Sequence, residues 1–500
     1  MQLLRGLGLF VAITCLVWVG VLWHWQATQR DMSPQDILLY LGALPVTVFV
    51  LGVASAWALR GVSTRTATAS ARSDLPSAAT STPTSAEAGH DRVQLLLAHA
   101  VSGAGGTVDD VLQAAQAGAP RPVLDTELHD AQGLPVLVAR VGEVDAASLA
   151  QELESLQAGL VGPASVAASL DDATFRALAL LTTQLEPTID ALAAWPERLG
   201  RPAETLRHTA AAVRTRVRVL VAWPAGTSEA QRALLQAWLD TWLRTHAEGV
   251  VAPDAWLLHA TTAGSGPELW LEADRLLAAM AREEQDDLVL LAACHSDLDA
   301  ASIERLEEAG ALFCATQPKG CIPGEGAAVL VLAGAHWPPA KADAPFAPHL
   351  HRAAIGRRDK AVDAAGRVGS ELAQELLRQS LAAAGVEAGT LAGLASDADQ
   401  HSARGPEMYG AMLAQLPDLD VGEDLCMAGQ LSGRTGPVAT LLTVAMAAQR
   451  CAQTQRPWAA LSVADPHWRL ALLARPAPAP APHPATAATD QAVHDDKTAA

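Results

Sequence analysis

The chain has 500 residues, half of them hydrophobic, and a formal net charge of −19 at pH 7. This length corresponds to about two or three average domains, or to one large α/β domain with appended segments. The acidic balance argues against sequence-independent nucleic-acid binding, which needs lysine and arginine to neutralise phosphates.

Two apolar runs open the chain. Residues 7–25 are almost wholly apolar, and Ile37–Leu59 form a second run that contains Pro45. Each run is long enough to cross roughly 30 Å of hydrocarbon as a helix, and the tryptophans near their ends suit a membrane interface. A cleaved signal peptide is the alternative for the first run. No small-residue cleavage site follows it, however, and a second apolar run comes at once.

The arginines around these runs predict their orientation. Arg5 precedes the first run and Arg60, Arg65 and Arg72 follow the second, whereas the connection Gln26–Asp36 carries a single arginine. Because positive residues stay on the cytoplasmic side, both termini are expected there. The sequence therefore predicts a two-helix anchor within residues 1–62, in a bacterial inner membrane, with the folded domain in the cytoplasm.

Two low-complexity segments bound the rest of the chain. Residues 63–90 are rich in serine, threonine and alanine, and residues 475–500 form an alanine–proline tail. Neither composition can bury a core, so we expect a flexible linker and a disordered tail. The folded body is then expected at residues 91–474.

Strands alternate with helices through this body. Val93–Ala98 are typical of a strand, Ser102–Gly106 form a glycine-rich loop, and Thr107–Ala117 are typical of a capped helix. The loop lacks the spacing of a dinucleotide site and the lysine of a P-loop. Further strands are expected at Gly133–Ala139, Val217–Trp223, Trp256–Ala260 and Asp287–Ala293, with helical covering segments and an insertion over residues 147–211. The alternation predicts an α/β fold with helices on both faces of parallel sheets.

The stretch Pro323–Leu332 has a distinctive beginning. Gly324 and Gly326 flank Glu325, and an unbroken apolar run follows. Such a run is typical of a strand buried on both faces, and the glycines allow a tight turn where a side chain would clash. This glycine–acid–glycine pattern resembles the strand that opens the second half of the β-ketoacyl synthase (thiolase-like) fold.

Two other places carry the same resemblance. The strand, loop and helix over Val93–Arg140 resemble the opening of a ketosynthase, and Gly429, Gly433 and Gly436 match a glycine frame of the family position for position. The resemblance implies an αβαβα layered fold of two pseudo-repeated halves, at about residues 91–310 and 311–474. It also implies a homodimer or heterodimer, because ketosynthases pair through a central strand of each subunit and so form one continuous sheet across the dimer.

The residues that carry ketosynthase chemistry are missing from the matching positions. The family's nucleophilic cysteine sits on a strand-to-helix turn that matches Thr261–Gly266, where Ala263 takes its place. One histidine position falls on Ser396, Asp397 or Ala398, and His401 is a few residues late and better explained as a loop residue. Three further positions also differ from the family: Gln430 replaces the second histidine, Leu425 replaces the lysine, and Ser462–Arg469 replace the terminal glycine-rich loop.

Other groups could still supply chemistry. Ser265 is a candidate nucleophile if a base lies within hydrogen-bond reach, and Cys314 or Cys321 could be a relocated nucleophile. Glu325 invites a general-base role, but the resemblance implies a structural one. The six cysteines (Cys15, Cys294, Cys314, Cys321, Cys426 and Cys451) include no zinc-ligand spacing. His349 and His351 lack a third ligand in register, so neither a metal nor a cofactor is expected.

These observations leave three functions open. The first is a non-catalytic, membrane-anchored thiolase-like scaffold that binds an envelope or secretion protein. The second is an inactive partner subunit of a ketosynthase in fatty-acid or polyketide synthesis, similar to chain-length factors, which also lack the cysteine. The third is a membrane-bound acyltransferase that uses Ser265 or Cys314. The first two make the protein a pseudoenzyme.

Overall fold

The computed structural model describes residues 92–159, 169–200, 215–339, 347–362, 364 and 369–477. All of them belong to one compact unit of the chain, Pro83–Ala500. The expected membrane spans, the linker over residues 63–90 and the tail beyond residue 477 lie outside the described residues. Within the described ranges, no helix is both long and apolar enough to cross a membrane.

The first half of the described chain contains these elements in order: β1 (Arg92–Ser102), α4 (Val108–Ala117), β2 (Val123–His129), β3 (Pro135–Val138), α5 (Ala146–Gly159), α6 (Asp172–Leu192), α7 (Pro196–Leu199), β4 (Val217–Ala222), α8 (Glu229–His246), β5 (Trp256–His259), α9 (Gly266–Arg282), β6 (Leu288–Ser296), α10 (Ala300–Glu308) and β7 (Glu325–Gly334). The second half contains β8 (His349–His351), β9 (Ala354–Arg357), α11 (Glu371–Ala384), the short 3₁₀ helix η4 (Ala388–Thr390), β10 (Gly393–Ser396), α12 (Arg404–Gln415), β11 (Leu425–Met427), α13 (Gly429–Ser432), α14 (Val438–Thr454), β12 (Trp458–Ser462) and β13 (Trp468–Arg475).

The two halves repeat one sheet topology. The strand order is β5-β4-β6-β7-β1 in the first half and β11-β10-β12-β13-β8 in the second. In each half the last of the five strands along the chain, β7 or β13, is antiparallel to its two neighbours in this order, and the other pairs are parallel. β1 pairs with β8, which joins the halves into one sheet path. The topology therefore contains an internal repeat of a five-stranded unit. β7 belongs to the first half-sheet because it pairs with β1 and β6, so the Gly324–Gly326 stretch does not open the second half as the resemblance led us to expect.

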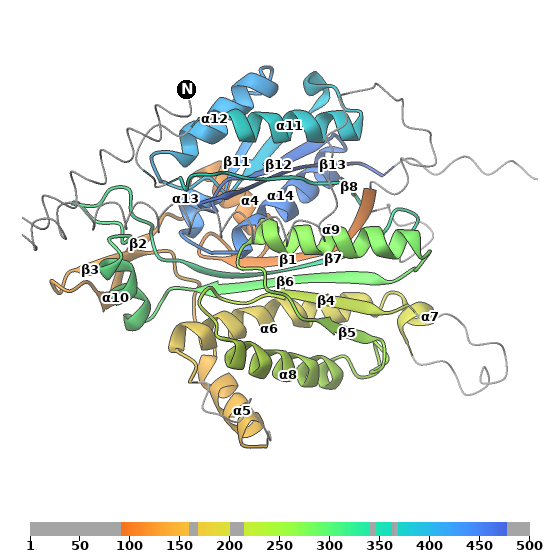
Figure 1. Ribbon diagram of the computed structural model, residues 1–500, viewed down its shortest axis with the longest axis horizontal. Helices are drawn as coiled ribbons and strands as arrows, with labels where there is room; N and C mark the ends of the chain where they lie inside the picture. The colour runs from red at the N-terminus through yellow and green to blue at the C-terminus, as the bar shows by residue number, and fades with distance from the viewer. Residues whose placement is uncertain are drawn as a thin grey trace, which may run out of the picture. The chain divides into compact units, whose positions relative to one another are not determined.

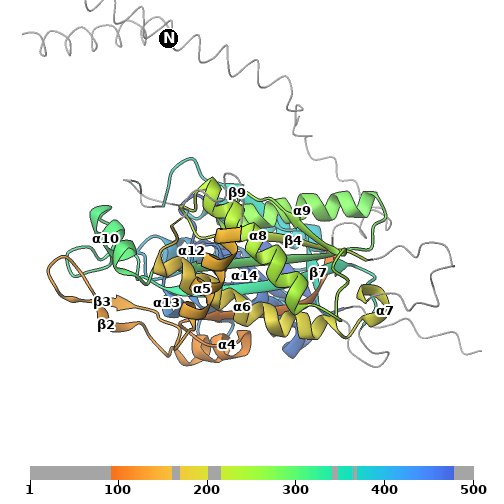
Figure 2. The same ribbon diagram turned by 90° about the horizontal axis from the view of Figure 1, so that it is seen from below.

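Helices and sheet halves stack as five layers (Figure 1). Helices α5, α6 and α8 pack on the outer face of the first half-sheet, and α11 with α12 pack on the outer face of the second. Between the half-sheets lie α4, α9 and α14, which share one apolar core with both. The layered α/β architecture expected from the sequence is confirmed. The two-stranded sheet β2-β3 projects from this body (Figure 2).

The central strands are apolar along their whole length because helices cover both of their faces. Every residue of β6 is buried, and so is β7 except for its last residue. The glycines before and within β7 are required by neighbouring backbone: a Cβ on Gly324 would lie 2.3 Å from the carbonyl oxygen of Ser432, and one on Gly326 would lie 2.6 Å from that of Val101. The start of β7 is thereby held against both halves.

The strand that joins the halves carries two histidines with low basicity. Burial is the main cause that lowers the pKa of His349 to about 4, and the nearby Arg92, His336 and Arg475 contribute to the same shift. Burial also lowers the pKa of His351 to about 4, together with the same two arginines. Both rings therefore remain neutral in the folded protein at pH values where an exposed histidine is already charged.

We expect the free energy of unfolding to fall as the pH drops from about 6.5 to about 4. In this window the unfolded chain binds protons at these histidines and the folded protein does not, so acid favours unfolding. Each fully buried histidine would contribute up to about 1.4 kcal/mol per pH unit, and less where solvent reaches the ring. Denaturant titrations at several pH values give the free energy of unfolding as a function of pH. This free energy should fall less steeply with acid in His349→Gln, whereas replacement of the exposed His129 by Gln should leave its pH dependence unchanged. A flat curve between pH 6.5 and 4.5 would contradict this.

Candidate functional site

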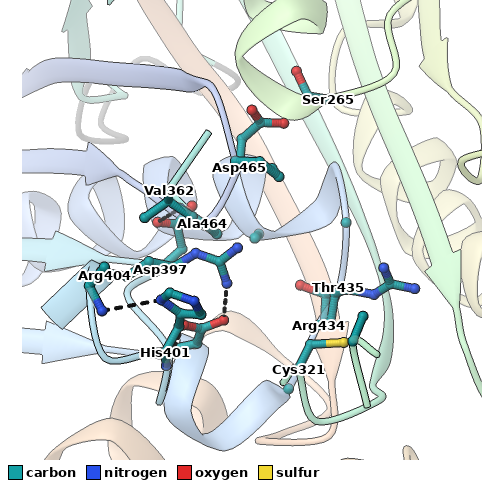
Figure 3. Close-up of a pocket in the computed structure, with 18 of the residues that line it drawn as sticks. Ser265, Cys321, Val362, Asp397, His401, Arg404, Arg434, Thr435, Ala464 and Asp465 are labelled. Carbon is teal, nitrogen blue, oxygen red and sulfur yellow. Dashed lines mark hydrogen bonds and ion pairs between the residues drawn. The ribbon is translucent and has the colours of Figure 1, made fainter. Parts of the chain in front are cut away.

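A cavity of about 700 Å³ lies between the two halves, next to the carboxyl ends of β5, β6, β10 and β12. Ligand crevices of α/β proteins form at this end of the strands. Figure 3 shows side chains that surround it: Ser265 and Asp465 on one side, Asp397, His401 and Arg404 on another, and Cys321, Arg434 and Thr435 opposite.

Ser265 acts as the cap of α9. Its Oγ accepts from the backbone N–H of Glu268 at 3.4 Å and donates to Glu268 Oε2 at 3.2 Å. The same carboxylate accepts from Gly264 N at 3.0 Å and from the indole of Trp468 at 3.0 Å. This bonding is that of a helix N-terminus and not of a nucleophile paired with a histidine base. Ala263 and its turn lead into this helix, but Ala263 does not line the cavity.

Asp397 ties the end of β10 to the end of β12. One carboxylate oxygen accepts from the backbone N–H groups of Val463 and Ala464 at 2.6 and 3.0 Å, and the other accepts from Ser462 Oγ at 2.5 Å. Burial raises the pKa of Asp397, although these hydrogen bonds oppose the rise. The carboxyl group therefore lines the cavity as a structural clamp, with its oxygens already engaged.

The glycine frame keeps the opposite wall close to its neighbours. A Cβ on Gly429 would lie 2.2 Å from the carbonyl oxygen of Asp397, and Gly433 and Gly436 both adopt positive φ angles, 63° and 54°. A Cβ on Gly436 would meet the ring of His295 at 2.9 Å. Gln430, one residue into the frame, is exposed and does not line the cavity.

His295, Asp297 and Arg434 form a charged group at the cavity that the sequence did not single out. The Nε2 atom of His295 lies 3.1 Å from Asp297 Oδ2, and Arg434 donates to both oxygens of Asp297 at 2.6 and 2.5 Å. Burial would raise the pKa of Asp297, but His295 and Arg434 hold it well below its usual range. The ionised carboxylate thus fixes the His295 ring, which is 5% exposed.

The other nitrogen of His295 faces the space left by Gly436. Neither ring nitrogen makes a hydrogen bond of good geometry in the described part of the chain, although Nε2 lies 3.1 Å from Asp297 Oδ2. Both nitrogens are buried, so His295 lines the cavity with its ring and offers no exposed nitrogen to a ligand in this arrangement.

A second charged group follows β10. Asp399 forms an ion pair with Arg404 and accepts from the backbone N–H of His401 at 3.0 Å. The Nδ1 atom of His401 accepts from Ala403 N at 3.1 Å (Figure 3). His401 thus lies at the cavity wall, where it also orders its own loop. The density of polar residues directly after a strand, Asp397 to Arg404, was the signal in the sequence for this group.

The two candidate thiols differ in position and acidity. Cys321 lines the cavity, and burial raises the pKa of its thiol. Cys314 lies outside the lining, and hydrogen bonding by Thr316, whose Oγ1 is 3.1 Å from Sγ, lowers its pKa. The thiol in the cavity is therefore the less reactive one.

Glu325 lies away from the cavity and is fully buried. It accepts two hydrogen bonds from Arg176 at 2.9 and 2.7 Å, one from Val141 N at 2.9 Å and one from Ser296 Oγ at 3.1 Å. Its carboxylate joins β7 to α6 and has no access to a substrate. Across the described ranges, no group of histidine, cysteine and carboxylate side chains is placed to hold a metal ion.

No protein-family model and no curated protein matches the sequence. Solved structures do match. The chain is similar to the ketosynthase from module 6 of the bacillaene synthase of Bacillus subtilis 168, with 14% identity, a TM-score of 0.51, and coverage of 78% of this chain and 73% of that one. It is also similar to the ketosynthase ApeO in complex with its chain length factor ApeC from Xenorhabdus doucetiae, with 14% identity, a TM-score of 0.48, and coverage of 77% and 98%. The ishigamide ketosynthase/chain length factor matches with 16% identity, a TM-score of 0.47, and coverage of 78% and 100%. At such low identity the first of these matches establishes the fold alone: the described body has a ketosynthase-type, thiolase-like fold.

Proposed function

We propose that this protein is a ketosynthase-type subunit that works by pairing with another thiolase-like chain and does not condense acyl groups itself. One observation carries the proposal. A cavity of about 700 Å³ lies between the halves, but Ala263 stands at the strand-to-helix turn where the sequence resemblance expects the nucleophile. The protein would shape a binding space for a partner's chemistry.

The contacts around the cavity support an absence of acyl transfer. Covalent acyl transfer needs a nucleophile within hydrogen-bond reach of a base. Ser265 is bonded to Glu268 as a cap, and the Cys321 thiol is held protonated by burial. Among the described residues that line the cavity, no serine or cysteine is hydrogen-bonded to a histidine.

The free edge of the first half-sheet supports pairing. β5 is the terminal strand of the sheet order, so one side of its backbone has no strand partner within the described chain. Leu257, Leu258 and His259 are half-buried there, and the Nε2 atom of His259 is buried without a hydrogen-bond partner. Unpaired strand edges invite a second chain. A homodimer and a heterodimer with an active ketosynthase would both supply a strand that pairs with this edge.

Sedimentation of the body, residues 91–474, tests the pairing. We expect association, either with itself or with an added ketosynthase, because an interface of this kind buries roughly 2,000 Å² or more. Leu257→Lys on β5 should abolish the association, since a charge on an edge strand blocks pairing. The matched control is Leu413→Lys, at a leucine that is 60% exposed on α12. A body that stays monomeric with every ketosynthase tried, or variants that behave alike, would refute pairing through β5.

We further propose that the apolar runs over residues 7–25 and 37–59 anchor the protein in a bacterial inner membrane, with the body in the cytoplasm. Arginine placement around the runs supports this orientation. A reporter that is active only in the periplasm should be active when inserted within Gln26–Asp36 and silent when fused after Ala474. The reverse pattern would overturn the orientation. With this anchor, a scaffold role in an envelope assembly is the second candidate function.

A further inference from the structure

A second cavity, of about 230 Å³, lies toward the C-terminal end of α9, whose N-terminus meets the first cavity. Its floor is apolar and is formed by side chains of β1, α9 and β8, among them Val93, Trp270, Leu277 and Leu350. Its rim is basic, and consists of Arg92, Arg282, His351 and Arg352. The lining thus combines an apolar surface with three arginines and a neutral histidine.

The positive charge of this rim is largely uncompensated. Asp274 is the one carboxylate in the lining, and it is paired with Arg352 at 3.0 Å. Within the described chain, Arg92 and Arg282 make no ion pair, and the Nε atom of Arg92 is buried without a hydrogen-bond partner. The depressed pKa of His351 reflects, after burial, the arginines around it. Such a cluster is unexpected in a chain with a net charge of −19.

The dipole of α9 explains only part of this arrangement. Carbonyl groups at a helix C-terminus carry a partial negative charge, which Arg282 in the last turn offsets. Arg92 and Arg352 come from β1 and from the residue after β8, so they are not required by the helix. Arg92 is therefore left with neither an ion pair nor a helix terminus to balance it, and Arg282 and Arg352 add to the positive charge around it.

We propose that this cavity binds the phosphate of an anionic phospholipid, with the first carbons of the lipid against the apolar floor. Arginine recognises phosphate through several parallel N–H groups, and basic pockets of membrane-associated proteins take anionic headgroups in this way. The volume corresponds to about eight water molecules, enough for a phosphate and a few carbon atoms. The apolar floor distinguishes a lipid from inorganic phosphate, which would not use it.

The test is a binding titration of the full-length protein in a neutral detergent. The probes are dihexanoylphosphatidylglycerol, dihexanoylphosphatidylcholine and inorganic phosphate. We expect saturable binding of the anionic lipid, with the other two probes at least tenfold weaker. The double variant Arg92→Gln/Arg282→Gln should weaken lipid binding at least tenfold. The matched control Arg121→Gln/Arg275→Gln removes the same charge from exposed arginines outside the lining.

Each outcome decides the proposal. Retention of binding in Arg282→Lys, which keeps the charge, would support a contact with an anion. An unchanged thermal midpoint in the double variant would exclude misfolding as the cause of weaker binding. Absence of saturable lipid binding would overturn the proposal, and so would equal losses in the double variant and its control. Inorganic phosphate that binds as tightly as the lipid would replace the lipid with a free phosphate.

Discussion

Replacement of Arg176 by methionine is expected to destabilise the folded body by about 3–5 kcal/mol. Arg176 donates two hydrogen bonds to Glu325, whose side chain is fully buried. Methionine would fill much of the space but leave the carboxylate without its counter-charge in a low-dielectric interior. Removal of one member of a buried pair is costly because the remaining charge has lost its hydration and gains nothing in return.

Chemical denaturation of the purified protein measures this loss. The matched control is Arg378→Met, which breaks the exposed pair of Arg378 with Glu375 and should leave the free energy of unfolding almost unchanged, because solvent screens such a pair. The double replacement Arg176→Met/Glu325→Leu should recover much of the stability, because no buried charge is left unpaired. A loss below 1 kcal/mol for Arg176→Met would mean that solvent reaches Glu325, and would contradict the packing of β7 against α6.

The second large effect is expected for Gly429→Ala. The new Cβ would lie 2.2 Å from the carbonyl oxygen of Asp397 and 2.8 Å from that of Ala398. This backbone cannot retreat easily, because the Asp397 carboxylate is bonded to Val463 and Ala464 at the end of β12. We expect a loss of about 3 kcal/mol or more, at the upper end of overpacking effects, or a failure to fold.

The melting temperature of Gly429→Ala, compared with that of the control variant Gly142→Ala, checks this expectation. A Cβ on Gly142 would have nothing within 4 Å, so that variant should stay within about 1 kcal/mol of the parent. Equal melting temperatures for the two variants would show that the cavity wall tolerates a shift of α13. The glycine frame would then be explained by chain flexibility and not by the contact with Asp397.

Together these two sites give a structural reason for parts of the ketosynthase-like sequence pattern. Glu325 and Gly429 hold β7 and the cavity wall in place through contacts that are independent of any reaction. A chain that needs the architecture for pairing would keep them. Asp397, at a position matched to a family histidine, has a structural contact of the same kind, because its carboxylate joins the end of β10 to the end of β12.

The regular elements could be predicted wherever the local pattern and the burial agree. β6 and β7 are continuous apolar runs because both of their faces are covered, and Thr107 was a readable cap because its Oγ1 accepts from the backbone N–H of Asp110. The hairpin β2-β3 was only half predicted: β3 lies within the expected strand Gly133–Ala139, whereas β2 was not expected. β2 is mostly exposed, so it lacks an apolar pattern.

The sequence by itself was enough to predict the α/β class, the glycines needed where the backbone packs closely, and the placement of Ser265 and Asp397 directly after strands. These features depend on neighbours in the chain or on a recognisable pattern. Only the tertiary structure decided which polar groups meet at the cavity. Arg434 pairs with Asp297 across 137 residues, and Arg176 pairs with Glu325 across 149. No local period encodes such pairs, since the contact exists only after two half-sheets and the helices between them have packed. The same packing buries His295 beside the cavity and gathers Arg92, Arg282 and Arg352 around a second one.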